Sequence, residues 1–270
     1  MQLALDHLVH FLDRPPVEAT EKFRQHGFHA VAGGRHEPWG TWNSLSYFGL
    51  SYVEFLSIEV RALAERSENP LIRQLVEEIA LGEGLAQIAL RTNRMNEWVN
   101  KLQKKDLIVQ GPVAGSRKRE DGSILSWRML FFEDPQSKLR PPFLIEWQQS
   151  DEERENDLKK RGSIAPHPNQ SNSLQQVGVA AAELEDAVQT WKRWLDCEVS
   201  EAWIDERIGA RCQALELGGT KRIVFCQPIA AGLASEALAA GGQRPFFATI
   251  AGATAGHDQI FGATYFREEQ

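Results

Sequence analysis

The sequence predicts an α+β fold built from repeated modules, each with one strand, one helix and three further strands. Two observations favour it: this order of elements recurs with a period of about 80 residues, which indicates internal duplication, and short apolar runs alternate with Gly- and Pro-containing turns. We expect modules at 1–60 and 84–150 to pair as a U-shaped mixed sheet around a cleft. A helical insert at 61–83, a charged linker at 151–170 and a third related module with a tail at 171–270 complete the predicted organisation.

The first module, at 1–60, contains the predicted strand, helix and three further strands in order. The apolar segment ALDHLVHFL (4–12) is typical of a strand. In 15–28 prolines open a helix, Val17, Thr20 and Phe23 share one face, and Gly27 ends it. A short strand then runs into the glycine-rich loop GGRHEPWG (33–40), and TWNSLSYFG and SYVEFLSIE form two strands joined by a tight turn.

The same order returns twice. The second module has a strand at 84–92, a helix in NRMNEWVNKLQKK and three strands ending in FLIEW (143–147). The third begins with SLQQVGVAA, continues with a helix over 182–196 and ends with three strands up to KRIVFCQPI. Beyond residue 230 the Ala- and Gly-rich tail contains one more apolar stretch, PFFATIAG, to which we assign no place.

Composition excludes several classes of protein. The formal net charge of -7 argues against nucleic acid, and the basic cluster SRKRE (116–120) is interpreted as a solvated hairpin end. No apolar run is long enough for a membrane span, and no signal peptide is evident. Three cysteines without metal-ligand spacing suit a reducing compartment, so we expect a cytoplasmic protein. Nucleophile-elbow, P-loop and dinucleotide motifs are absent from the sequence.

Two glutamates lie inside apolar strands, where an ionised carboxylate needs a partner. Glu54 and Glu146 are therefore expected to bind a metal, to line a wet pocket, or to form ion pairs with Arg91 or Arg128. Strand alternation places His7 on the face of Leu5 and Val9, and Glu146 on that of Leu144. His7 could equally be a core histidine bonded to backbone, and Gln87 a plain polar cavity residue.

Several motifs together resemble the vicinal oxygen chelate superfamily, and in particular its glyoxalase-like branch. They are LDHLVHFL in the first strand, FFEDP followed by FLIEW in the last hairpin, GGRHEPWGTWN, and the later HPN. The resemblance implies that two modules enclose a divalent metal held by the first and last strands of each module. Its ligands here would be His7, Glu54, Gln87 and Glu146. Such a set suits Zn, Ni, Mn or Mg.

The resemblance implies two alternative functions. One is a metal-dependent lyase or isomerase of the glyoxalase I type, in which Glu54 or Glu146 moves a proton through an enediolate-type step. The other is a metal-free module that binds a small molecule. The partner in both cases is a small molecule, with no nucleic acid or membrane, and a homodimer is a further expectation. Candidate substrate-binding residues are His36, Trp39, Trp42, Asn43 and Arg128.

Overall fold

The computed structural model describes residues 3–119 and 122–269 and confirms the α+β fold of repeated modules. The first module consists of β1 (Ala4–Leu12), α1 (Pro16–Gln25), β2 (Val31–His36), β3 (Thr41–Phe48) and β4 (Ser51–Ile58). The second consists of β5 (Gly84–Arg91), α4 (Met95–Gln103), β6 (Ile108–Lys118), β7 (Ile124–Glu133) and β8 (Phe143–Trp147). The predicted order of one strand, one helix and three strands is thus present in both.

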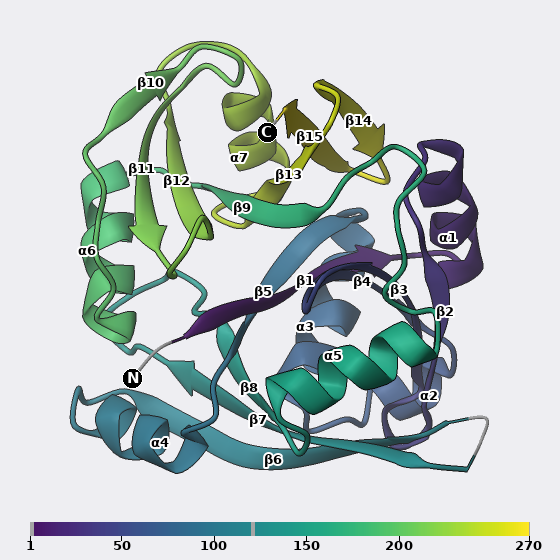
Figure 1. The fold of residues 1–270 in the computed structure, drawn as a ribbon. Helices are drawn as coiled ribbons and strands as arrows, with labels where there is room; N and C mark the ends of the chain where they lie inside the picture. Colours follow the sequence, from purple (N-terminus) through teal and green to yellow (C-terminus); the bar gives the residue numbers. More distant parts are fainter. Residues whose placement is uncertain (1–2, 120–121, 270) are drawn as a thin grey trace.

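These two modules form one mixed sheet of eight strands in the order β2-β3-β4-β1-β5-β8-β7-β6. The opening strands, β1 and β5, pair antiparallel at its centre, and each lies parallel to the last strand of its own module. The sheet is curled (Figure 1), so it has a concave and a convex face. Because side chains alternate along each strand, alternate residues of these central strands face the cleft.

The helical insert packs on the concave face. It contains α2 (Arg61–Ala64) and α3 (Pro70–Glu78), and the side chain of Asn69 caps α3 by accepting a hydrogen bond from the backbone N–H of Leu71. Leu71, Ile72 and Leu75 are buried in an apolar cluster with concave-face residues of the strands. The insert therefore fills one end of the cleft.

Residues 151–160, which the sequence analysis assigned to a charged linker, form helix α5 (Asp151–Lys160). Its start is a capping box in which Ser150 and Glu153 exchange hydrogen bonds. Leu158 packs with Tyr47 and Tyr52 of the first module. This helix covers the concave face beside the insert.

The rest of the chain forms a second sheet. Its elements are β9 (Ser173–Ala180), α6 (Leu184–Leu195), β10 (Trp203–Asp205), β11 (Ala210–Glu216), β12 (Arg222–Pro228), α7 (Leu233–Gly241), β13 (Pro245–Gly252), β14 (Gly256–Ile260) and β15 (Ala263–Glu269). The strand order is β10-β11-β12-β9-β13-β15-β14. β13 pairs antiparallel with β9 and parallel with β15, as β5 does with β1 and β8. The unassigned tail is therefore a shortened fourth module.

One apolar core joins the two sheets. It contains convex-face residues such as Leu8 and Leu90 of the first sheet together with Val177 and Tyr265 of the second. His10 lies within this junction, where its ring nitrogens contact the Tyr265 hydroxyl at 2.7 Å and the Phe261 carbonyl at 2.8 Å. Within the described residues, no helix has the length and apolar character required to cross a membrane.

Candidate functional site

The concave face of the first sheet encloses a cavity of about 60 Å³, called here the inner cavity. The insert closes one side of it through Leu71 and Ile72. Its other lining side chains fall into a polar group and a mostly aromatic group. The polar group contains His7, His36, Asn43, Glu54 and Arg117. The aromatic side chains are Trp39, Tyr47, Tyr52, Trp127, Phe143 and Trp147.

An irregularity in β1 places His7 at this cavity and the adjacent Asp6 directly behind its lining. The register of β1 against β5 shifts between Leu5 and His7, which is typical of a β-bulge with Asp6 as the additional residue. His7 stacks on Tyr52 with 4.6 Å between ring centroids, and Asp6 accepts a hydrogen bond from the Trp147 indole at 3.1 Å. Leu5 lies in the core on the opposite face, so the expected shared face of Leu5 and His7 is wrong.

Asp6 is fully buried and holds four donors around its carboxylate. Besides the Trp147 indole, these are His7 Nδ1 at 2.7 Å and one Nη1 each from Arg91 and Arg154 at 3.1 Å. Burial by itself raises the pKa of Asp6, but Arg154, His7 and Arg91 outweigh it and hold this pKa well below its usual range. Asp6 is therefore ionised, and it fixes a proton on Nδ1 of His7.

Glu54 lies on the other side of His7. Its Oε2 is 3.4 Å from His7 Nε2, and its Oε1 accepts a hydrogen bond from Asn43 Nδ2 at 2.5 Å. His7 Nδ1 carries the hydrogen that it donates to Asp6. The contact between His7 Nε2 and Glu54 Oε2 is therefore favourable when a second proton lies between these two atoms. The carboxylate–imidazole–carboxylate array can therefore hold a proton and exchange it with a bound molecule.

His36 and Trp39 come from the end of β2 and the turn that follows it, and they form another side of the cavity. Their ring centroids are 5.6 Å apart, and His36 Nδ1 contacts the Thr41 hydroxyl at 3.1 Å. Burial lowers the pKa of His36; Glu54 opposes this lowering and Arg117 adds to it. A neutral His36 offers the cavity a hydrogen-bonding group without a charge.

Four other predicted residues lie outside this cavity: Trp42, Gln87, Arg128 and Glu146. Trp42 adjoins Asn43 on the strand and therefore faces the opposite side, where the guanidinium of Arg35 is 5.7 Å from its ring centroid. Gln87 lies under α3, where its amide donates to Gln74 Oε1 at 3.2 Å and accepts from the Ile88 backbone N–H at 2.8 Å.

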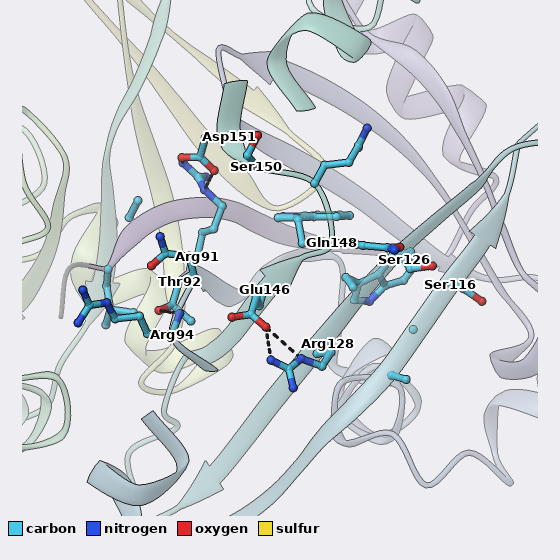
Figure 2. Close-up of a pocket in the computed structure, with 18 residues that line it drawn as sticks. Arg91, Thr92, Arg94, Ser116, Ser126, Arg128, Glu146, Gln148, Ser150 and Asp151 are labelled. Atoms are coloured by element: carbon cyan, nitrogen blue, oxygen red, sulfur yellow. Dashed lines mark hydrogen bonds and ion pairs between the residues drawn. The ribbon is translucent and has the colours of Figure 1, made fainter. Parts of the chain in front are cut away.

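Glu146 points away from the cavity because Ile145 and Trp147, on either side of it, face the concave side. It lines an open groove of about 1340 Å³, called here the outer groove, with Arg91, Arg94 and Arg128 (Figure 2). Glu146 accepts hydrogen bonds from Arg128 Nε at 3.0 Å and from the Met95 backbone N–H at 3.1 Å. The half-buried charge in FLIEW is thus explained by an ion pair and by the start of α4.

The four predicted metal ligands consequently lie in three places: His7 and Glu54 in the inner cavity, Gln87 under the insert, and Glu146 in the outer groove. In the part of the chain that the structure describes, no three His, Cys, Asp or Glu side chains converge closely enough to hold a metal ion. The donor set does not fit a metal centre of three or four protein ligands.

Asp6, Arg117 and Arg154 are site residues that the sequence analysis missed. Asp6 carried a signal, since it is a third carboxylate inside an apolar strand, next to His7. Arg117 belongs to the cluster interpreted as solvated, yet the hairpin of β6 and β7 carries it to the inner cavity. Arg154 lay in a charge-rich segment, where nothing distinguishes a buried arginine from its solvated neighbours.

The curled sheet of paired modules, with its cleft on the concave face, defines a member of the vicinal oxygen chelate superfamily. The chain belongs to the glyoxalase-like domain family, whose model matches residues 5–195. A hypothetical protein from Staphylococcus aureus has a similar structure, with a TM-score of 0.79 and 22% identity over 99% of this chain and 100% of that chain. A triple mutant of 4-hydroxymandelate synthase from Streptomyces coelicolor matches with a TM-score of 0.58 and 10% identity, over 93% and 71% of the two chains. The search of curated proteins gives no significant match.

Proposed function

We propose that this protein binds a small oxygen-bearing molecule in the inner cavity through hydrogen bonds and apolar contacts, without a metal ion. The observation that supports this is the separation of the predicted ligands, because Gln87 and Glu146 are both engaged away from His7 and Glu54. The polar groups of the cavity are bonded to one another, and an aromatic wall completes it. A small site of mostly apolar lining with a few convergent polar groups is typical of ligand binding.

The size of the cavity restricts the ligand. Its volume of about 60 Å³ is less than half of the roughly 150 Å³ of an apolar cavity that holds benzene. Without movement of side chains, the cavity accepts a molecule of few non-hydrogen atoms, or one end of a larger molecule.

Elemental analysis of the protein purified without chelator tests the metal-free proposal. We expect metal well below one equivalent per chain, and no rise in melting temperature on adding Zn, Ni, Mn or Mg. A small ligand that enters the cavity should raise the melting temperature of the parent protein. A stoichiometric metal that is lost in both His7→Ala and Glu54→Gln would instead support the metal-dependent lyase.

The array of Asp6, His7 and Glu54 supports a second candidate, a proton-transfer isomerase or lyase. In such a step Glu54 removes a proton from the carbon next to a carbonyl group, and the electron pair moves onto the carbonyl oxygen to give an enolate. Nuclear magnetic resonance of small carbonyl compounds in deuterated water would detect this as hydrogen exchange at that carbon. We expect Glu54→Gln to abolish the exchange and Glu146→Gln, the matched change outside the cavity, to leave it unaltered; equal exchange in all three proteins would refute the candidate.

A further inference from the structure

We infer that the molecule bound in the inner cavity carries a carboxylate, and that Arg117 binds this group. The inference rests on the proposed function, because it names the ligand class of the same cavity. It follows from the position of Arg117, from a second buried arginine and from the engagement of the acidic groups nearby.

Arg117 reaches the cavity across β2. Its side chain lies over Gly34, where an added Cβ would be 2.7 Å from Arg117 Cδ, so a side chain at this position would displace it. Among the described residues Arg117 has no carboxylate within ion-pair distance. Its hydrogen bond, from Nη1 to Asn43 Oδ1, is long at 3.4 Å, and the Gly34 N–H donates to the same oxygen at 2.9 Å. The guanidinium therefore has donors left for a ligand.

A second positive charge lies behind the aromatic wall. Arg154 is only 2% exposed, and its guanidinium carbon is 4.1 Å from the ring centroid of Trp147, which lines the cavity. Its Nη1 donates to Asp6, but its buried Nη2 has no hydrogen-bond partner among the described residues. Since Arg91 also donates to Asp6, two guanidinium groups share this one buried carboxylate.

The carboxylate of Glu54 opposes this positive charge at the cavity but forms no ion pair with Arg117. Glu54 is the acidic side chain among the described lining residues, and its two oxygens already contact Asn43 and His7. After burial, Glu54 raises and Arg117 lowers the pKa of His36, so the charges of both side chains act within the cavity. An anion in direct contact with the Arg117 guanidinium gains more from this charge than a neutral molecule of the same shape.

The rest of the cavity restricts the polarity and the size of the remainder of the ligand. Trp39, Trp127 and Phe143 provide an apolar wall, and the volume suits an acid of about two to four carbon atoms. A carboxylate on a guanidinium forms charge-assisted, bidentate hydrogen bonds, which an amide of equal size cannot form.

Matched acids and amides test the inference on the full chain. Isothermal titration calorimetry at neutral pH would compare acetate, propionate and butyrate with acetamide, propionamide and butyramide. We expect the best acid to bind at least about tenfold more tightly than its amide. Arg117→Met, which keeps the apolar stem, should remove this preference, and Arg117→Lys should retain part of it. Arg94→Met changes an arginine of the outer groove and should bind like the parent.

The remaining outcomes overturn either the inference alone or the proposed function together with it. Equal binding of acids and amides by the parent, or an unchanged preference in Arg117→Met, would refute the inference while leaving the proposed binding function standing. Loss of acid binding in Arg94→Met would place the anion in the outer groove and refute it as well. Failure of every acid and every amide to bind would overturn the proposed function, and the inference with it.

Discussion

Replacing Asp6 by Asn should destabilise the protein strongly, although the side chain keeps its size. Asp6 is the ion-pair partner of Arg154, whereas Arg91 also contacts Asp151 at 2.8 Å. An amide in place of the carboxylate removes the charge and sets an NH2 group against donors. Removal of one member of a buried pair costs about 3–5 kcal/mol, because the other charge remains buried without compensation.

Urea unfolding followed by tryptophan fluorescence measures this loss. With an m-value of about 3 kcal/mol per molar, the midpoint should fall by about 1 to 1.7 M. The matched control is Asp13→Asn, at an exposed position just after β1, which we expect to change stability by less than about 0.5 kcal/mol. A loss below about 1 kcal/mol in Asp6→Asn would show that Arg154 does not depend on this carboxylate.

The same pair predicts a pH dependence. The pKa of Asp6 is depressed in the folded protein, mainly because Arg154 opposes the effect of burial. Its stabilisation is therefore complete above the unfolded pKa of about 3.9 and is lost as the pH falls below that value. The difference in unfolding free energy between the parent and Asp6→Asn should be constant from pH 7 to 5 and should shrink between pH 4 and 3. A constant difference down to pH 3 would contradict the assigned ion pair.

Three further predictions concern positions around the site. Glu146→Gln should lower the free energy of unfolding in urea by only about 1 kcal/mol, because the ion pair with the half-exposed Arg128 is weak. The variant should bind ligand like the parent, and a loss of binding would show that Glu146 belongs to the binding site. Burial lowers the pKa of His10 to about 4. Between pH 6.5 and 4 the unfolded chain takes up a proton that the folded protein does not, so the free energy of unfolding should fall by up to about 3 kcal/mol over this range. His10→Gln should make this pH dependence weaker. Gly33→Ala would put a Cβ 1.9 Å from Asn43 Oδ1 and displace that side chain. Calorimetry should then show weakened ligand binding with the fold retained. Unaltered affinity would mean that Asn43 does not hold the polar groups of the site in place.

The sequence could predict the modules because the apolar periods and turns are local signals. It could also indicate that Glu54 shares a face with Tyr52 and Leu56, since β4 is regular, and all three line the cavity. It could not decide which face of FLIEW meets the cleft. Both Leu144 and Ile145 are apolar and buried, one in the core on the convex face and the other on the concave face. Alternation alone gives two faces without saying which of them is the cleft.

Two features of the site have no local signature. The bulge at Asp6 appears only in the register of β1 against β5, which is set by pairing with residues far along the chain. The insert was recognisable as a helix, but its position over Gln87 depends on how α3 packs on the curled sheet. Residue type and spacing therefore identified two of the four expected ligands as neighbours, whereas packing decided where the other two lie.

The concave faces of the two sheets differ in the side chains that line them. In both sheets a helix from an insertion packs on the concave face, α3 in the first and α7 in the second. The strand residues that pack with α7 are apolar, among them Ala210, Cys212, Ala214 and Cys226, so that helix packs directly on them. Under and beside α3 the corresponding surface contains His7 and Glu54, whose polar groups need partners. It also contains large aromatic rings, whose bulk keeps the walls of the inner cavity apart. The same repeated architecture thus forms an apolar core where its inward residues are apolar, and a candidate binding site where they include polar and charged side chains.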